Sequence, residues 1–290
     1  MFEAIGNAIH TFSSWLNLPL FITLIGGGLF FMIYSGFIPL RYYGKALKAV
    51  GVKEDSAAGQ ISSFQALSSA IAATVGLGNI SGVAVAITIG GPGTIFWMWV
   101  SACLGMATKF FEGTLAIMFK GKDSKGELQG GTMYMITEGL GKKWKPLAVL
   151  FSIFGMVGTF CLMQSNQLTE ALQTVIFTPA GIENTLWLRL ATGLSIAGIV
   201  SLVVLGGINR IARVASLIVP FMVGFYFLLV IYIILTNLSV VPDVFSSIFS
   251  QAFTFKAGLG GLAGSAIVIG ARRAAFVNEA GVGTATMMHG

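Results

Sequence analysis

The sequence predicts an all-α protein that crosses a membrane several times. Of its 290 residues, 55% are hydrophobic and only 10% are charged, whereas soluble domains carry about 25% charged residues. The apolar residues gather in runs that are long enough to span a bilayer, since about 20 of them cross the hydrocarbon as a helix. The basic residues lie mainly in the connections between these runs. We therefore expect a multi-pass membrane protein.

Seven apolar runs are long enough to be membrane spans. Before the first of them, apolar residues recur at roughly helical spacing as far as Leu18, which predicts a short helix lying at the membrane interface. The loop 120–145 is expected to be a surface connection with a short amphipathic helix. The expected spans are residues 20–40, 64–89, 94–119, 147–177, 186–205, 214–238 and a glycine-rich stretch from Gly258 onward.

The basic residues indicate how these spans are oriented. When the connections are assigned alternately to the two sides, one side carries fourteen Lys and Arg residues and the other carries two, while Lys109 lies within a span. Cytoplasmic loops carry the excess of basic residues, so we expect the N-terminus outside and the loop 120–145 in the cytoplasm. The isoelectric point near 9.4 then reflects membrane topology, and we expect no nucleic-acid partner.

The second span is interrupted near its midpoint by Gly76, Gly78, Asn79 and Gly82. Each glycine in a helix costs roughly 1 kcal/mol relative to alanine. Unwound backbone at membrane depth is tolerated only where it is buried in protein or lines a cavity. Broken membrane helices that hold polar ligands are typical of secondary transporters. We therefore expect a ligand site at this break.

The break offers hydrogen-bond donors for an anion and oxygen ligands for a cation. The amides of Leu77 and Gly78 would point along the dipole of the following helix and form a site for a carboxylate. Carbonyl oxygens released from helical hydrogen bonds would suit a hard cation such as sodium, which takes oxygen ligands. The candidate cation ligands are the carbonyl oxygens of Ala72, Thr74 and Val75 and the side-chain oxygen of Asn79.

A structural role for the same residues stays open. Small residues allow membrane helices to approach closely, and this accounts for Gly76 and Gly78. It does not account for Asn79, whose polar side chain is costly at membrane depth.

Polar residues also cluster within the fourth span, at positions 164–167. Gln164 and Gln167 are three residues apart and therefore share a helical face. Such residues face the interior of a bundle, where they either bond helices together or contact substrate. Substrate contact is expected chiefly at Gln164, and Glu170 is a candidate vestibule residue one turn further on.

Charged residues near the expected cytoplasmic side have structural interpretations. Lys109 and Glu112 are three residues apart, which predicts an ion pair, with a proton relay as the alternative. A gate network or a direct ligand role is expected of the C-terminal group, which comprises Arg272, Arg273, Asn278 and Glu279.

Little in the sequence indicates an enzyme or a metal protein. His10 and His289 lack ligand-type neighbours, and the two cysteines fall within apolar runs. Ser265 could be read as a nucleophile after Gly264, but no histidine or lysine within the spans is placed to activate it.

Several blocks resemble the alanine/glycine:cation symporter family, and the resemblance covers essentially the whole chain. The loop block Gly130–Tyr134 has threonine at 132, where the family usually has proline. The other blocks are residues 73–84, which read ATVGLGNISGVA, residues 90–99, which read GGPGTIFWMW, residues 105–110, residues 164–166 and residues 276–283.

The resemblance implies a fold and an activity. The family is similar to the amino-acid/polyamine/organocation superfamily, with a leucine-transporter-like core of two inverted five-helix repeats. Residues 1–63 would form the N-terminal segment, an extra helix and a cytoplasmic loop, 64–238 the first repeat, and 239–290 a loop and the start of the second repeat. The expected activity is sodium-coupled symport of alanine or glycine by alternating access, in a plasma membrane such as the bacterial inner membrane.

The resemblance also implies site residues. The amides of Leu77 and Gly78 would bind the substrate carboxylate. Ala72 and Val75 would belong to one sodium site, and Thr74 and Asn79 to a second. A break in the seventh span would face the first one. The full set of expected substrate-binding residues is Thr74, Gly76, Leu77, Gly78, Asn79, Gln164, Gly260, Gly261 and Ser265.

Family members have four further core helices, so the sequence is expected to be part of a longer protein and not to transport unaided. Three other interpretations stay open. They are a channel or transporter of the same fold for another solute, proton coupling in place of sodium, and a fragment that only inserts into membrane lipid and associates.

Overall fold

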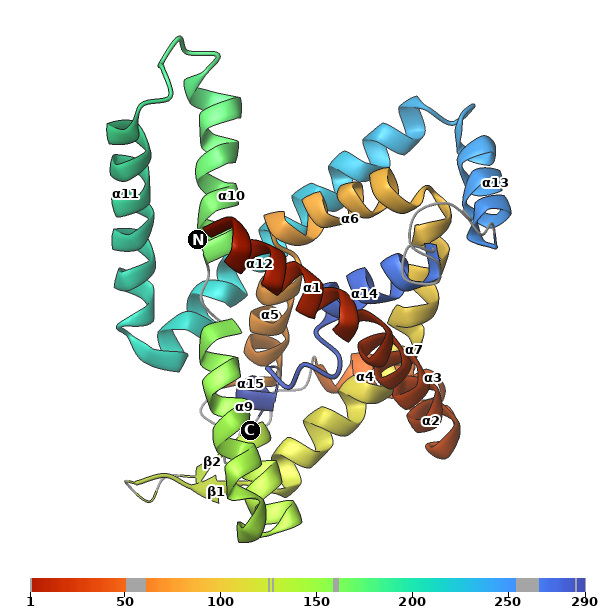
Figure 1. Cartoon of the computed structure of the whole chain (residues 1–290), viewed down its shortest axis with the longest axis vertical. Helices are drawn as coiled ribbons and strands as arrows, with labels where there is room; N and C mark the ends of the chain where they lie inside the picture. The colour runs from red at the N-terminus through yellow and green to blue at the C-terminus, as the bar shows by residue number, and fades with distance from the viewer. Residues whose placement is uncertain are drawn as a thin grey trace.

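The computed structural model describes residues 2–50, 61–124, 126, 128–158, 162–253, 266–284 and 286–289, and this part of the chain is almost entirely helical (Figure 1). The N-terminal helices are α1 (Phe2–Phe21), the π-helix η1 (Ile22–Gly26), α2 (Gly27–Tyr34), α3 (Ile38–Arg41), α4 (Tyr43–Val50), α5 (Ser63–Thr74), α6 (Leu77–Gly90) and α7 (Gly93–Met118). A hairpin of β1 (Gly121–Lys122) and β2 (Leu128–Gln129) follows. The remaining elements are α8 (Thr132–Tyr134), η2 (Met135–Leu140), η3 (Lys142–Trp144), α9 (Lys145–Gly158), α10 (Leu162–Leu172), η4 (Gln173–Phe177), α11 (Leu186–Val204), α12 (Gly207–Thr236), α13 (Val241–Ala252), α14 (Ala266–Asn278) and α15 (Thr286–His289).

Four described helices are long and apolar enough to cross a membrane, and a fifth span results if the bent pair α5 and α6 is counted as one. The third and fifth predicted spans coincide with α7 and α11 within one residue. The sixth corresponds to α12, which begins at Gly207, seven residues before the predicted position 214. The predicted span starts later because Arg210 and Arg213 in the first turns of the helix interrupt the apolar run. The prediction of an all-α membrane protein is confirmed.

The predicted count of seven spans stays a prediction. The fourth expected span contains α9 and α10, which are separated by residues 159–161 outside the described part of the chain. The seventh includes α14, whose 13 residues are too few to cross a bilayer by themselves. The glycines at 258–264 lie outside the described residues.

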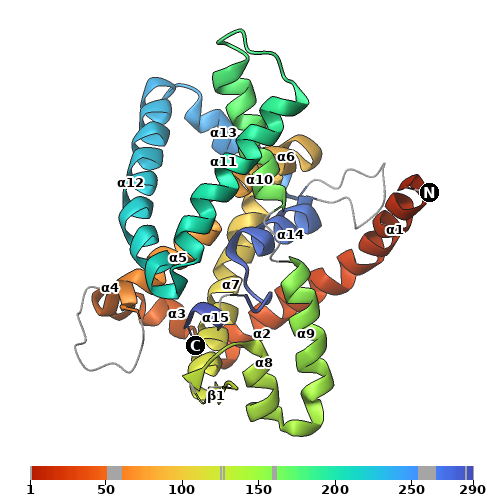
Figure 2. The ribbon, with the colours of Figure 1, turned by 90° about the vertical axis from the view of Figure 1, so that its left-hand side faces the viewer.

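The N-terminal segment differs from the expected interfacial helix. Helix α1 continues through the π-turn η1 into α2, and the candidate span begins at Ser14. In Figure 2, α1 extends away from the other helices and carries the N-terminus at its far end. The segment and the first span therefore form one continuous helical rod.

Local sequence signals explain where several helices begin. Ser62 and Gln65 form a capping box at the start of α5, in which Gln65 N donates to Ser62 Oγ at 3.3 Å and Ser62 N donates to Gln65 Oε1 at 3.0 Å. The Thr185 hydroxyl accepts a hydrogen bond from Leu188 N at the start of α11. Gly91, with φ of 79°, ends α6 just before Pro92 and α7.

Helix α7 lies at the centre of the packing, against α2, α6, α13 and α14. The contact with α14 depends on small residues. A Cβ atom at Gly270 would lie 2.5 Å from the carbonyl oxygen of Thr94, and Ala107 on α7 is fully buried. Small residues let membrane helices approach closely. This close approach brings α14 beside α6, the second half of the broken pair.

The other helices form the outer part of the structure. Helix α12 packs along α5, and α10 and α11 form an antiparallel hairpin that extends beyond the other helices (Figures 1 and 2). Large apolar side chains on these helices are exposed, such as Trp187 and Leu205 at 80% and 85%. Exposed apolar surface of this kind matches a lipid environment.

Candidate functional site

The predicted break in the second span is present. Helix α5 ends at Thr74, and Val75 and Gly76 have non-helical backbone angles before α6 begins at Leu77. The axes of the two helices differ by 43°. The first intrahelical bond of α6 runs from Asn79 N to Gly76 O at 3.0 Å, so the amides of Leu77 and Gly78 lie ahead of it at the helix N-terminus.

The side chain of Asn79 spans the break. Its Nδ2 atom donates to the carbonyl oxygen of Thr74 at 2.5 Å, which supplies the partner that the helix would otherwise have provided. The Thr74 hydroxyl in turn donates to the carbonyl of Ala70 at 3.2 Å. A carbonyl oxygen has two lone pairs, so Thr74 O can still accept a cation beside Asn79.

Gln167 of α10 packs against the first turn of α6. Its Oε1 atom lies 2.8 Å from the position that a Cβ atom of Gly78 would take, and its Nε2 atom donates to Ser81 Oγ at 3.1 Å. Oε1 is buried and has no hydrogen-bond partner among the described residues. Gln164, the glutamine favoured by sequence, is exposed. The structure therefore brings the second glutamine of the cluster to the break.

Arg273 of α14 reaches the same turn from another direction. Its Nη2 atom donates to the carbonyl oxygen of Gly78 at 3.3 Å. The guanidinium covers Gly82 so closely that a Cβ atom there would overlap it. The Nε atom is buried and lacks a hydrogen-bond partner within the described part of the chain. Arg273 thus lies beside the break, and its expected position near the cytoplasmic face stays a prediction.

The expected ion pair between Lys109 and Glu112 is not formed. Lys109 Nζ donates to the carbonyl oxygen of Asn278 at 3.2 Å, while Glu112 Oε1 accepts from Gly281 N at 3.0 Å. Within the residues that the structure describes, the ion pair closer than 4.0 Å is Arg189–Glu170. Both side chains bond instead to backbone groups at the last residue of α14 and in the turn after it, and these two bonds hold the end of α14 against α7.

The loop block beginning at Gly130 meets the same C-terminal turn. The Thr132 hydroxyl donates to the carbonyl oxygen of Gly283 at 3.1 Å and lies 3.0 Å from Thr286 Oγ1, which is buried. Glu279 Oε2 accepts from the Thr284 hydroxyl at 2.6 Å. Two sequence blocks about 150 residues apart thus form one polar contact, which we call the C-terminal clasp.

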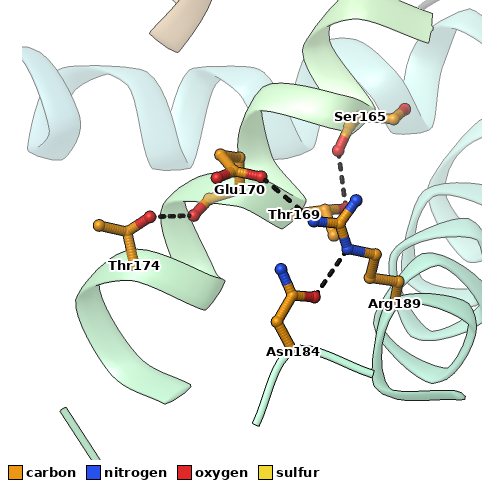
Figure 3. A network of polar contacts seen from close by, with 6 residues as sticks. All are labelled: Ser165, Thr169, Glu170, Thr174, Asn184 and Arg189. Atoms are coloured by element: carbon orange, nitrogen blue, oxygen red, sulfur yellow. Dashed lines mark hydrogen bonds and ion pairs between the residues drawn. The ribbon is translucent and has the colours of Figure 1, made fainter. Parts of the chain in front are cut away.

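Glu170, the expected vestibule residue, belongs to a surface network at the α10–α11 turn (Figure 3). One of its carboxylate oxygens lies 3.9 Å from Arg189 Nη2, and Arg189 Nε donates to Asn184 Oδ1 at 2.7 Å. Both charged side chains are more than half exposed. The network holds the two ends of the hairpin turn together and lies away from the break.

The second glycine-rich segment cannot be compared with the first. Gly260, Gly261, Gly264 and Ser265 lie outside the described residues. Their expected position opposite the first break stays a prediction.

With this geometry established, sequence comparison identifies the family. The sodium:alanine symporter family model matches residues 2–290. The chain belongs to the sodium:alanine symporter family. The resemblance inferred from the blocks around the break is thereby confirmed, and the protein is a member of a family of membrane transporters.

Three relatives illustrate the similarity. An uncharacterised transporter of Haemophilus influenzae is 43% identical over 98% of this chain and 61% of its own length. The sodium/alanine symporter AgcS of Methanococcus maripaludis is 40% identical over 96% and 61%, respectively. The putative sodium/proton-dependent alanine carrier protein YrbD of Bacillus subtilis is 41% identical over 92% and 53%. The chain thus spans about three fifths or less of the length of these relatives.

Sequence reasoning found the break but not all of the side chains around it. The polar cluster 164–167 contained the signal for Gln167, although its spacing did not distinguish it from Gln164. Arg273 was noticed as a charged residue, but its place beside Gly78 depends on the close approach of α14 to α7.

Proposed function

We propose that this sodium:alanine symporter family member carries a small neutral amino acid, alanine or glycine, into the cell together with sodium, by alternating access. The observation that carries the proposal is the break at Val75 and Gly76, where helical amides and carbonyls come free within a membrane-spanning segment. The amides of Leu77 and Gly78 are the candidate cradle for the substrate carboxylate.

Sodium is the proposed coupling ion. The carbonyl oxygens of Ala72, Thr74 and Val75 end the first half of the broken helix, and Asn79 brings a side-chain oxygen to the same place. This is an all-oxygen donor set, which suits a hard cation. The hydrogen bond from Asn79 to Thr74 holds two of these candidate ligands together before an ion binds.

The remaining parts of the proposal concern size and orientation. Gln167 packs so closely against Gly78 that a Cβ atom there would lie 2.8 Å from its Oε1, and this tight packing at the break favours a small substrate. We propose that the N-terminus is outside the cell and that the loop 120–145 is cytoplasmic. If Arg272 and Arg273 are left out of the count, because Arg273 lies beside the break, the connections still divide twelve basic residues to two.

Uptake by the protein, in the full length that its gene encodes, tests this function. Proteoliposomes with an inward sodium gradient should accumulate labelled alanine, and unlabelled alanine and glycine should compete more strongly than glutamine or a nucleobase. Replacing external sodium with choline should abolish accumulation. Accumulation driven equally well by an inward proton gradient without sodium would favour the proton-coupled alternative, while no accumulation under either gradient would reject the proposed symport.

A further inference from the structure

Two buried polar atoms without partners flank the first turn of α6. In the described part of the chain, five buried side-chain polar atoms lack a hydrogen-bond partner, and two of them, Gln167 Oε1 and Arg273 Nε, belong to side chains that contact Gly78. One is an acceptor from α10 and the other is a donor from α14. Gln167 Oε1 lies against Gly78, whereas Arg273 Nε lies against Gly82, one turn further along α6.

The guanidinium of Arg273 lacks both a described carboxylate partner and a hydrogen-bond acceptor for its buried Nε. A charged side chain within a membrane protein is costly unless it is paired. No described carboxylate lies within 4.0 Å of Arg273, since the ion pair found among the described residues is Arg189–Glu170. Its contact with the Gly78 carbonyl at 3.3 Å uses one donor of the guanidinium, and the buried Nε is left over. An incoming anion would satisfy this group.

The side chain of Gln167, by contrast, has a buried acceptor oxygen that lacks a hydrogen-bond donor. Its Nε2 donates to Ser81 Oγ at 3.1 Å, and this bond fixes the orientation of the amide so that Oε1 points towards Gly78. A buried acceptor oxygen without a partner costs about 1–3 kcal/mol. An incoming ammonium group would satisfy it.

We propose that Arg273 and Gln167 are side-chain ligands of the zwitterionic substrate, Arg273 binding its carboxylate and Gln167 its ammonium group. This inference rests on the proposed function and adds a cationic side chain to the backbone amides considered above. Guanidinium and carboxylate are complementary in charge and geometry and form strong, often bidentate hydrogen bonds. The arrangement gives the site a polarity, with carboxylate towards α14 and ammonium towards α10.

The glycines of α6 make this arrangement possible. Gly82 gives the guanidinium room to lie against the helix, because a Cβ atom there would overlap it. Gly78 gives the same room to Gln167 Oε1. Gly224 of α12 lies outside this site and has no atom within 4 Å of a Cβ position, so it tolerates alanine and is a matched control.

Binding to the purified protein tests the assignment. Alanine affinity is measured by calorimetry in sodium for the wild type, Arg273→Gln, Arg273→Lys, Gln167→Leu and the control Arg213→Gln, which changes an exposed arginine of α12. We expect a loss of tenfold or more for Arg273→Gln, partial recovery for Arg273→Lys, a similar loss for Gln167→Leu and a change of less than twofold for Arg213→Gln. Unchanged alanine affinity in a folded Arg273→Gln would overturn the assignment.

Two further measurements test the assignment even if the Arg273 or Gln167 variants fail to fold. Gly82→Ala keeps the charge but displaces the guanidinium, and it should weaken alanine binding at least tenfold, while Gly224→Ala should not. In the wild type, alaninamide, which lacks the carboxylate, should bind at least tenfold more weakly than alanine, and so should propionate, which lacks the ammonium. Alaninamide affinity equal to that of alanine would overturn the role of Arg273. A wild type that binds no alanine at all would instead reject the proposed function.

Discussion

Asn79 donates a hydrogen bond of 2.5 Å across the helix break to the carbonyl oxygen of Thr74. The two residues are five positions apart, which is one more than the spacing of an α-helical hydrogen bond. The side chain thus replaces a backbone donor at the point where the helix opens. Its amide joins the end of α5 to the first turn of α6 and places a side-chain oxygen beside the freed carbonyls.

Asn79 is predicted to support both the break and the sodium site. Asn79→Ala removes the donor to Thr74 O and should cost about 1 kcal/mol of stability, while weakening sodium activation by tenfold or more. Asn79→Asp keeps an oxygen but loses the donor, so it should retain more sodium affinity than Asn79→Ala. Sodium titration of alanine uptake, normalised to folded protein, measures both effects. Wild-type sodium affinity in a folded Asn79→Ala would make Asn79 a packing residue only.

Gly78 is predicted to be essential for substrate binding. A leucine there would collide with Gln167, since even a Cβ atom would lie 2.8 Å from Oε1. Gly78→Leu should abolish the thermal stabilisation by alanine that a ligand of the native state produces. Gly27→Ala, where no atom lies within 4 Å of the new Cβ, should keep it. Normal stabilisation of the Gly78 variant would move the substrate site elsewhere.

The C-terminal clasp is predicted to stabilise the fold. Thr132→Val keeps the shape of the side chain but removes the hydrogen bonds to Gly283 O and to buried Thr286. The loss of about 1 kcal/mol should lower the melting temperature by about 2–4 °C. The control Thr137→Val removes a hydroxyl that bonds within its own helical turn, to Met133 O, and should change it less. Equal melting temperatures for Thr132→Val and wild type would show that the clasp contributes nothing.

The Glu170–Arg189 pair should have little effect on stability or transport. Both side chains are more than half exposed, and exposed pairs contribute about 0.2–1 kcal/mol. Arg189→Ala should therefore change the melting temperature only slightly and leave alanine uptake intact, as measured by thermal denaturation and a transport assay. A severe transport defect in a stable Arg189→Ala would show that the hairpin turn in Figure 3 takes part in the transport cycle.

The orientation predicted from the basic residues is tested by labelling. In a Cys103→Ser, Cys161→Ser background, single cysteines at Ser124 and Asn184 should react with a membrane-impermeant maleimide from opposite sides, with position 184 labelled in intact cells. Position 124 should react only after the membrane is opened. Labelling of both positions from the same side would invalidate the assignment of the intervening spans.

How far the sequence predicts the fold depends on how local each signal is. The break could be predicted because glycines and Asn79 interrupt an apolar run, and α7 and α11 could be predicted from the lengths of their runs. The choice between Gln164 and Gln167 could not be predicted, because the two residues share a helical face and differ only in the helices that pack against them.

Contacts between residues far apart in the sequence explain the other differences between the predicted and the observed structure. The spacing of Lys109 and Glu112 predicts an ion pair, yet both side chains bond to backbone groups 169 residues away in sequence. Arg273 was assigned to a connection by charge counting, whereas Gly270 lets α14 pack closely against α7 and brings the guanidinium to Gly78. Neither contact has a signature in the local sequence.

The central claim is that sodium and a small amino acid bind together at the break between α5 and α6. The most direct test is the dissociation constant of alanine, measured by calorimetry on the purified full-length protein in sodium and in choline at equal ionic strength. Coupled binding predicts a change of about 5- to 150-fold, with an equal reciprocal effect of alanine on sodium affinity. Identical alanine affinity in sodium and in choline would contradict the account.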